Sequence, residues 1–254
     1  MLDLQGYGPS IFNGAILTVK LAIFSLIIAV LLGLITAVAR YSGGKLSSAL
    51  ALAYTSLVRG VPDLVLMMLI YFGLQLGLNN FSEWLYELHE THAINEFYIE
   101  QGWLTLSAFY EDGMYLNIDE FSAGVVTIGF IFGAYMGETF RGALLSVDKG
   151  QLEAATAYGM SDWQIFRRVM FPQMMRFALP GIGNNWLVLV KTTALVSIIG
   201  LSDMVKLAKE AAMTTYEPFL FFIPVAFVYL AITTVSEIVL KYLERHFSKG
   251  VEGH

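Results

Sequence analysis

Five stretches of this 254-residue chain are each long and apolar enough to cross a lipid bilayer. A helix needs about 20 apolar residues to span roughly 30 Å of hydrocarbon. The stretches are approximately Ile11–Val38, Val61–Leu78, Phe121–Leu145, Gly181–Leu201 and Phe219–Leu240. Because backbone polar groups inside a bilayer must be hydrogen-bonded within the protein, such stretches form helices. We therefore expect an all-α integral membrane fold with five transmembrane helices, in a single transmembrane domain over residues 1–254.

The composition argues against several kinds of functional site. Charged residues make up 14% of the chain, whereas soluble domains carry about 25%. There is no cysteine, which excludes disulfides and thiolate metal sites. The four histidines all lie outside the apolar stretches, and "HETH" (89–92) does not match the zinc-protease pattern HExxH. We expect no catalytic residue, no metal site and no cofactor bound by this chain.

The distribution of Lys and Arg indicates the orientation in the membrane, because cytoplasmic loops are enriched in these residues. Positive charges follow the first, third and fifth stretches. They are Arg40, Lys45 and Arg59; Lys149, Arg167, Arg168 and Arg176, with Arg141 at the edge of the third stretch; and Lys241, Arg245 and Lys249. Residues 80–120 instead hold nine acidic residues and no Lys or Arg. We predict that the N-terminus and the 80–120 loop lie on the outer side of the membrane, and that the C-terminus and the loop at 148–172 lie on the cytoplasmic side.

The cytoplasmic loop at 148–172 contains "QLEAATAYGMSDWQIFRRVMFP". Asp148 with Gln151 has capping-box spacing, and Gly159 is placed to end the helix, which predicts a short helix over about 149–158. Ser161 with Gln164 starts a second helix that we expect to stop before Pro172. Helices this short are not stable alone in water. They must be held by the membrane spans or by a partner protein.

The same loop carries a recognisable pattern. Glu153, Ala154 and Ala155, then Gly159, and finally Pro172 follow the form EAA-x3-G-x9-I-x-L-P, with Val169 and Phe171 where Ile and Leu are usual. This resembles the EAA loop of ABC importer permeases. Further similar blocks lie at 59–75, 133–144 and 176–201. Together they resemble the polar-amino-acid permease family of the histidine/lysine/arginine/ornithine type, over nearly the whole chain except 80–120.

The resemblance implies a type I ABC importer permease of the bacterial inner membrane, without catalytic activity of its own. It implies transport of polar, and in particular basic, amino acids such as histidine, lysine, arginine and ornithine. The expected partners are a homologous, HisM-like second permease subunit in a heterodimer, an ATPase dimer, a periplasmic amino-acid-binding protein and the lipid bilayer, with no nucleic acid. Since the chain has no G-x-x-x-x-G-K-[ST], ATP is used by the partner subunit.

The resemblance also assigns a role to the loop. It implies that the loop forms a coupling helix that docks on the ATPase, with Glu153 facing a basic group of that partner. Ala154 and Ala155 would permit close approach, Gly159 would allow the turn, and Pro172 closes the motif. The alternatives are a permease for another polar amino acid such as glutamine, or an ATP-independent secondary transporter. The latter would show an inverted repeat or a midplane helix break.

Ionisable residues inside a membrane are costly and usually functional. Our candidates for the substrate path are Glu138, Lys191, Thr192, Thr193, Asn184, Asn185 and Asp63. Glu138 would accept the substrate ammonium, and Lys191, Thr192 or Thr193 would bind its carboxylate. Asp63 is expected at the inner start of the second span. The structural alternatives are that Glu138 pairs with Arg141 (i,i+3) or with Lys191, and that the two Asn are solvated at the membrane surface.

The 80–120 segment contains "EWLYELHETHAINEFYIEQGWL" (83–104). One hypothesis is that its apolar residues contact a periplasmic solute-binding protein. The alternative, which we favour, is a solvated insertion held at the membrane surface by aromatic anchors.

Overall fold

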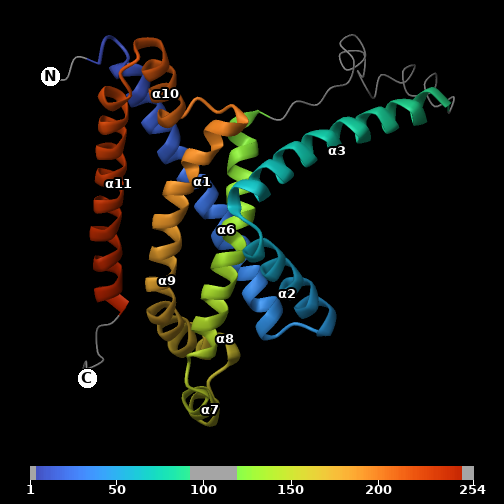
Figure 1. Ribbon diagram of the computed structural model, residues 1–254. Coiled ribbons are helices and arrows are strands. Elements are labelled where there is room, and N and C mark those ends of the chain that lie inside the picture. The colour runs from blue at the N-terminus through green and yellow to red at the C-terminus, as the bar shows by residue number, and fades with distance from the viewer. Residues whose placement is uncertain (1–3, 92–118, 248–254) are drawn as a thin grey trace, which may run out of the picture.

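The computed structural model describes residues 4–91 and 119–247, and these residues form helices and no strands (Figure 1). The α-helices are α1 (Gly8–Tyr41), α2 (Lys45–Gly60), α3 (Asp63–Thr91), α6 (Glu120–Leu145), α7 (Lys149–Ala157), α8 (Asp162–Ile165), α9 (Phe171–Thr192), α10 (Met204–Thr215) and α11 (Pro218–Phe247). A π-helix covers Phe166–Met170 and a 3₁₀-helix covers Thr193–Ile199. The all-α expectation is confirmed for the described residues. Most of the predicted 80–120 insertion lies outside them.

Five helical segments of the described residues are long and apolar enough to span a membrane, which confirms the predicted number. They are α1, α3 over Asp63–Trp84, α6, the continuous segment Asp162–Ile199, and α11. The prediction that the cytoplasmic helix stops before Pro172 is wrong. The chain passes from α8 through the π-helix into α9, and Pro172 lies in the first turn of α9. Because the π-helix already interrupts the regular hydrogen-bond ladder, the missing N–H of Pro172 is tolerated there.

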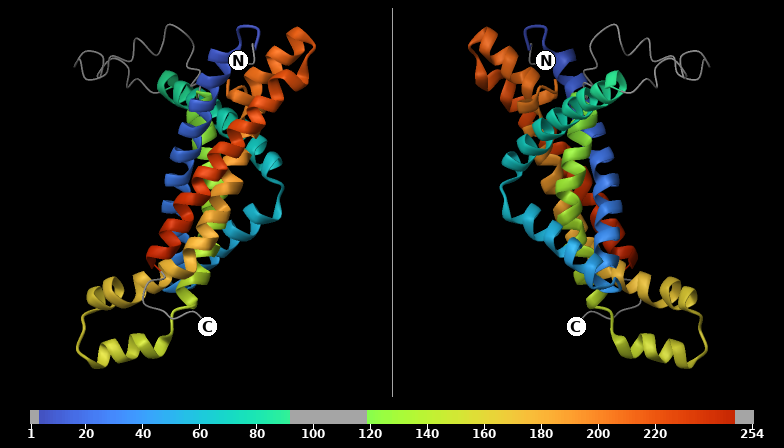
Figure 2. Two further views of the ribbon diagram at one scale, coloured as in Figure 1. Left: turned by 90° about the vertical axis from the view of Figure 1, so that its left-hand side faces the viewer. Right: turned by 90° about the vertical axis from the view of Figure 1, so that its right-hand side faces the viewer.

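Two further helices, α2 and α10, were not predicted. α2 buries Ala51, Thr55 and Val58 against the bundle and leaves other residues exposed. α10 packs on α1 and α11 at the end of the bundle where α1 begins (Figures 1 and 2). Asp203 caps its N-terminus, because the Asp203 carboxylate accepts a hydrogen bond from the Lys206 backbone N at 2.9 Å. Both helices are too short to span the bilayer, so a search for long apolar stretches does not find them.

α1 and α6 form the centre of the bundle and run in the same direction. Small residues recur at every fourth position of α1 (Ser25, Ala29, Gly33 and Ala37) and of α6 (Gly129, Gly133 and Gly137). A Cβ on Gly33 would lie 2.5 Å from the Met136 Cβ and 3.0 Å from the Gly137 backbone N. The Ser25 hydroxyl donates to the backbone O of Val125 at 3.3 Å. Small residues at this spacing let two membrane helices approach closely, so that the packing itself holds them together.

The other spans surround this pair unequally. In the most apolar 18-residue window of each helix, 67% of the residues of α6 are buried, against 11% for α3 and for α11. α9 packs on α6 and on α11, and α3 extends away from the bundle at its outer end (Figure 1). α3 and α11 therefore retain broad faces for lipid, for another subunit or for a water-filled path.

The close contact of α1 and α6 predicts different effects of the same substitution at two helical glycines. Gly33→Ala places a methyl group against Met136 and the α6 backbone, and overpacking of this kind costs about 1–3 kcal/mol. Gly73→Ala on α3 is the matched control, because a Cβ there has no atom within 4 Å. We expect Gly33→Ala to lower the thermal unfolding midpoint of the detergent-solubilised protein and Gly73→Ala to leave it unchanged or raise it. Equal midpoints would contradict this packing.

Candidate functional site

Glu138 of α6 forms an ion-pair cluster with two arginines. One carboxylate oxygen accepts from Arg40 Nη1 of α1, and the other accepts from Arg141 Nε at 3.2 Å. Arg40 also reaches the Thr55 hydroxyl of α2, at 3.5 Å. The side chains of Arg40 and Glu138 are 14% and 20% exposed. The predicted Glu138–Arg141 pair is confirmed, Lys191 is not the partner of Glu138, and Arg40 was missed.

This cluster, formed by Glu138, Arg40 and Arg141, joins α1, α2 and α6. Both carboxylate oxygens of Glu138 already accept charge-assisted hydrogen bonds, which are stronger than neutral ones. In this conformation a substrate ammonium would have to displace a guanidinium to reach Glu138. The geometry favours the structural interpretation of this residue.

Asp63 is the first residue of α3 and contacts α6. The Tyr135 hydroxyl donates to its carboxylate at 3.3 Å, and the Arg59 guanidinium lies 5.8 Å from the centre of the Tyr135 ring. Tyr135 is 15 residues after Glu120, the first residue of α6, which corresponds to about 22 Å along the helix. α2 rises beside α6 before α3 begins (Figure 1). Asp63 is therefore at the start of the second span, as predicted, and lies at the level of Tyr135 of α6.

The polar residues of α9 face in different directions. Asn184 is exposed, whereas the Asn185 amide donates to the Thr139 hydroxyl of α6 at 3.0 Å. Thr192 and Thr193, at the end of α9, are buried, and their hydroxyls donate to the backbone O atoms of Val188 and Val190 in α9. Because α9 begins at Phe171, the two Asn lie in the middle of this helix, and the expectation that both are solvated at a membrane surface is wrong for Asn185.

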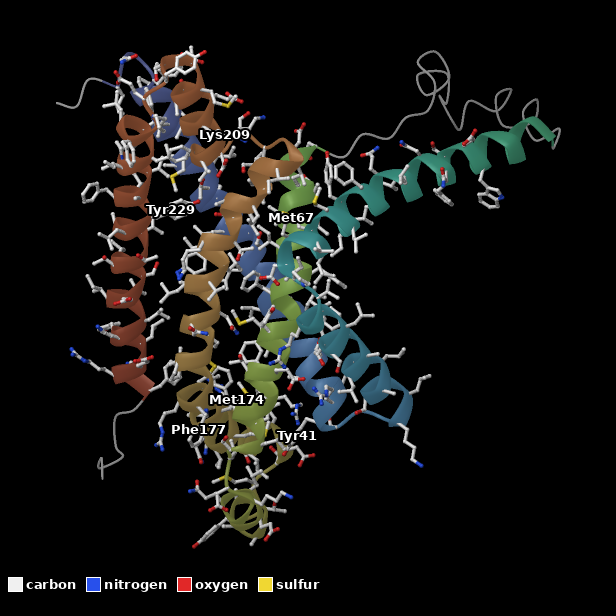
Figure 3. All side chains as sticks on the ribbon, viewed as in Figure 1. Tyr41, Met67, Met174, Phe177, Lys209 and Tyr229 are labelled. Atoms are coloured by element: carbon white, nitrogen blue, oxygen red, sulfur yellow. The ribbon has the colours of Figure 1, made fainter. Side chains whose placement is uncertain are left out.

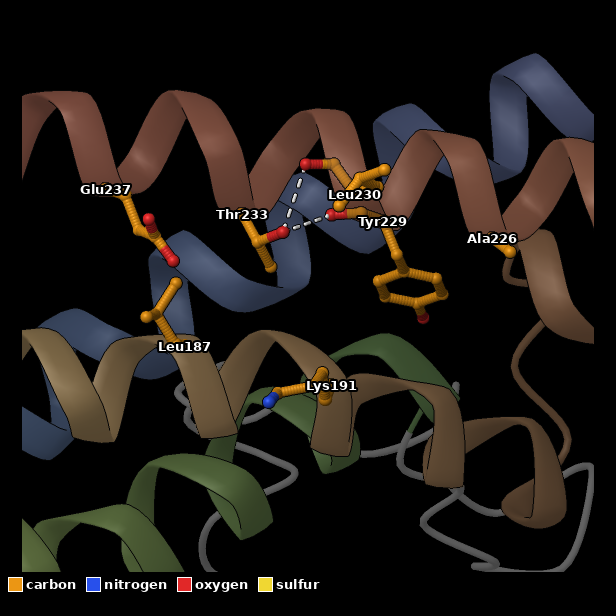
Figure 4. A pocket seen from close by; sticks show the side chains of 7 residues that line it. All are labelled: Leu187, Lys191, Ala226, Tyr229, Leu230, Thr233 and Glu237. Atoms are coloured by element: carbon orange, nitrogen blue, oxygen red, sulfur yellow. Dashed lines mark hydrogen bonds between the residues drawn. The ribbon is translucent and has the colours of Figure 1, made fainter.

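Lys191 opens onto a groove between α9 and α11, with a volume of about 340 Å³ (Figure 4). Its polar lining is Lys191 from α9 and Tyr229, Thr233 and Glu237 from α11. Tyr229 points from α11 toward α9 (Figures 3 and 4). We call this feature the α9–α11 groove. The three α11 residues were missed, although an acidic residue within an apolar stretch, as at Glu237, was a visible signal.

The polar groups of the groove are incompletely paired. Among the described residues, Lys191 has no ion-pair partner, and the buried Tyr229 hydroxyl, which lies near the Thr193 side chain, makes no hydrogen bond within 3.5 Å. The Thr233 hydroxyl donates within its own helix, to the carbonyls of Tyr229 and Leu230 at 3.0 Å each. Glu237 approaches only Lys241, at 4.0 Å. The groove thus presents both signs of charge to a ligand.

The loop between α6 and α9 projects from the end of the bundle where the C-terminal end of α11 lies (Figure 2). Gly159 has φ +77°, the left-handed conformation predicted from its position after the helix. The predicted Ser161–Gln164 capping box is present, with Ser161 N donating to Gln164 Oε1 at 3.0 Å.

The predicted Asp148–Gln151 box is not formed. Asp148 instead accepts from Gly150 N at 2.7 Å. The Gln151 side chain accepts from the Gln173 amide of α9 at 2.6 Å, which fastens α7 to the start of that helix.

Within the motif, the side chains divide by exposure. Glu153 and Ala154 are exposed, whereas Ala155 is buried inside the loop. Tyr158 and Trp163 are 86% and 66% exposed. Large exposed aromatic side chains on a short loop outside the membrane spans are typical of a contact surface.

Comparison with known proteins places this geometry among transport proteins. Residues 29–249 match the family described as "Binding-protein-dependent transport system inner membrane component". The chain is 47% identical to the histidine/lysine/arginine/ornithine transport system permease protein HisQ of Escherichia coli, over 98% of both chains. It is 32% identical to the octopine transport system permease protein OccQ of Rhizobium radiobacter, over 98% of this chain and 97% of that one. It is 35% identical to the arginine ABC transporter permease protein ArtQ of Escherichia coli, over 91% and 92%.

Solved structures agree with these sequence matches. A chain from a crystal structure of an amino acid ABC transporter with histidines superposes with a TM-score of 0.73 and 30% identity, over 96% of this chain and 97% of that one. A chain from an inward-facing structure of the MetNI methionine ABC transporter superposes with a TM-score of 0.61 at 15% identity, over 95% of both chains, which shows the shared fold.

The Glu138 cluster predicts a specific pattern of stability. Glu138→Gln leaves partly buried guanidinium groups without their counter-charge, which we expect to cost about 1–3 kcal/mol. Adding Arg40→Met removes one of the unpaired cations and should recover part of the loss. Glu210→Gln, at an exposed position of α10, is the control. The measurement is the thermal unfolding midpoint of the purified protein.

A Glu138→Gln variant as stable as the control would contradict the structural role. If that stable variant also lost amino-acid transport, Glu138 would be a substrate contact instead.

Proposed function

The chain belongs to the family of binding-protein-dependent transport system inner membrane components, and we propose that it is the permease subunit of an ABC importer for basic amino acids. The carrying observation is its 47% identity to HisQ over 98% of both chains. Histidine, lysine, arginine and ornithine are the substrates that the name of that relative states. The chain has no nucleotide-binding P-loop, so ATP hydrolysis belongs to a partner subunit.

We propose a periplasmic N-terminus and a cytoplasmic C-terminus in the bacterial inner membrane. The Lys and Arg residues that follow the first, third and fifth spans support this orientation. The N-terminal end of α1 lies at the opposite end of the bundle from α7 and the C-terminal end of α11 (Figure 1). In this orientation residues 1–254 form one transmembrane domain of type I importer architecture, 80–120 is a periplasmic insertion, and 148–172 is cytoplasmic.

The proposed partners follow from the family description and from the incompletely covered spans. They are a homologous, HisM-like second permease subunit, two ATPase subunits and a periplasmic amino-acid-binding protein. α3 and α11, with few buried residues in this chain alone, offer surface for the second permease subunit. A helix bundle of five spans encloses a substrate route most readily when two such bundles face each other.

We propose that the loop couples transport to the ATPase through Glu153, Ala154, Ala155, Gly159 and Pro172. The exposed Glu153 carboxylate supplies the charge for a basic group of the ATPase, and exposed Ala154 permits close approach. Buried Ala155 supports the loop from within. Gly159 makes the turn, and Pro172 lies where the loop enters α9.

The proposed substrate path draws on Glu138, Lys191, Thr192, Thr193, Asn184, Asn185 and Asp63. Their shared feature is polarity within membrane-spanning helices, where such groups are costly unless they have a task. Lys191, on the open α9–α11 groove, is the best placed to bind a ligand. The hydrogen bonds of three of these side chains are made to other groups of the protein, so we propose that they support the path without contacting the substrate. They are Glu138, Thr192 and Thr193.

An uptake assay tests the proposed function. The permease, its second subunit and the ATPase are reconstituted in liposomes, with the binding protein on the opposite side of the membrane from ATP. We expect concentrative uptake of radiolabelled arginine, lysine and histidine only when ATP is supplied. A preference for glutamine would favour the other polar-amino-acid permeases, and equal uptake without ATP would show a secondary transporter.

The coupling role predicts that two loop variants separate assembly from activity. Glu153→Arg places a like charge against the basic group of the ATPase and should abolish substrate-stimulated ATP hydrolysis. Glu210→Arg, the same change on exposed α10, should not. Gly159→Val strains the left-handed turn, whereas Gly159→Asn is tolerated there and should retain more activity. The readouts are membrane insertion, co-purification of the ATPase and ATP hydrolysis. Normal coupling in Glu153→Arg would refute the docking role of that residue.

A further inference from the structure

The α9–α11 groove lies on a face whose charged residues make contact with lipid energetically unfavourable. Lys191 is exposed on α9, and the Glu237 side chain is 55% exposed on α11. Both lie within helices that span the membrane. Charged side chains within membrane-spanning helices are costly, and they almost always face the bundle interior or a water-filled cavity. This face must therefore meet a water-filled path or a polar surface.

The groove combines the groups that the two charges of an amino acid require. Lys191 brings a cation without an ion-pair partner among the described residues, and Glu237 brings an anion on the opposite wall (Figure 4). Tyr229 lies on the other side of Lys191 from Glu237 (Figure 4), and its buried hydroxyl lacks a hydrogen-bond partner in the described structure. A buried hydroxyl left unpaired costs about 1–3 kcal/mol. Such a group is explained if a ligand or an ordered water occupies the groove.

The remaining geometry suits a small zwitterion. The volume of about 340 Å³ is at the lower end of the range for small-molecule sites, about 300–1,000 Å³. Leu187, Ala226 and Leu230 supply apolar walls, which strengthen charge interactions by excluding water. Glu138, the other intramembrane acid considered for the substrate, already has both oxygens bonded to arginines.

We propose that the α9–α11 groove binds the zwitterionic head group of the transported amino acid. Lys191 binds the α-carboxylate, Glu237 binds the α-ammonium, and the Tyr229 hydroxyl donates to the carboxylate. This inference rests on the proposed function as an amino-acid permease. It assigns the groove to the part that all amino acids share, so that the side chain of the substrate is left for other contacts.

Substrate analogues test each contact separately. The probes are radiolabelled L-arginine, argininamide, which lacks the carboxylate, and N-acetylarginine, which lacks the α-ammonium. Equilibrium binding is measured on the permease–ATPase complex in nanodiscs without the binding protein, so that only the membrane site selects. We expect wild type to bind arginine more tightly than either analogue, by about tenfold or more, as the loss of one hydrogen bond to a charged group predicts.

Each single variant of a charged groove residue should lose the preference for arginine over one of the two analogues. Lys191→Met should lose the preference for arginine over argininamide and keep the preference over N-acetylarginine, and Glu237→Gln should do the reverse. Tyr229→Phe, which preserves the shape of the side chain, should weaken arginine binding several-fold. Arg245→Met and Glu244→Gln, on α11 outside the groove lining, are the matched controls and should bind as wild type does.

Three results would overturn the proposal. They are a wild type that binds arginine and both analogues alike, groove variants that keep both preferences, and a double variant Lys191→Met/Glu237→Gln that recovers wild-type binding. The last would show that the two residues serve only to neutralise each other. Failure of the proposed function is separate, because it appears as a lack of ATP-dependent uptake in the liposome assay, whereas any of these three results with uptake intact rejects the groove alone.

Discussion

The close approach of α1 and α6 through small residues is the contact on which the rest of the bundle depends. In lipid there is little hydrophobic force between helices, so association relies on van der Waals packing and on a few hydrogen bonds. Gly33 facing Met136 and Gly137 facing Thr36 provide that packing. α2 adds to it through Tyr54, whose hydroxyl donates to the backbone O of Phe130. The Glu138 cluster then joins α1, α2 and α6 with charge-assisted hydrogen bonds.

Around α1 and α6, the charged residues of the membrane-spanning helices are of two kinds: those paired within the bundle and those that line an open groove. Both carboxylate oxygens of Glu138 are paired with arginines, and this residue stabilises the packing of the helices. Lys191 and Glu237 line an open groove on helices that are less enclosed. The loop that we assign to ATPase coupling connects α6, the central helix, to α9, one wall of the groove. A displacement of that loop would therefore act on α9 directly, and Gln151–Gln173 is the contact that ties the two.

The parts of this structure that sequence reasoning predicted are governed by local chemistry. Apolar length identified the five spans, the left-handed requirement identified Gly159, and Ser161–Gln164 spacing identified a capping box that is present. The parts that it missed depend on distant partners. Arg40 and Glu138 are 98 residues apart in the sequence, and no local sequence pattern predicts that they form an ion pair. Pro172 was misread because the π-helix before it removes the usual conflict with an α-helix. Glu237 was overlooked because the charges of α11 were considered only for orientation.

The central claim is that the face of α9 and α11 that carries Lys191 and Glu237 lines a water-filled path for the substrate. Because the chain contains no cysteine, single cysteines report accessibility without background. Thr233→Cys lies in the groove, and Val235→Cys lies on the same helix outside the groove lining. The most direct measurement is the rate of modification by a charged, membrane-impermeant thiol reagent in the assembled transporter. We predict fast modification at position 233, slowed by arginine, and slow modification at 235. Equal rates, or no protection by arginine, would contradict the account.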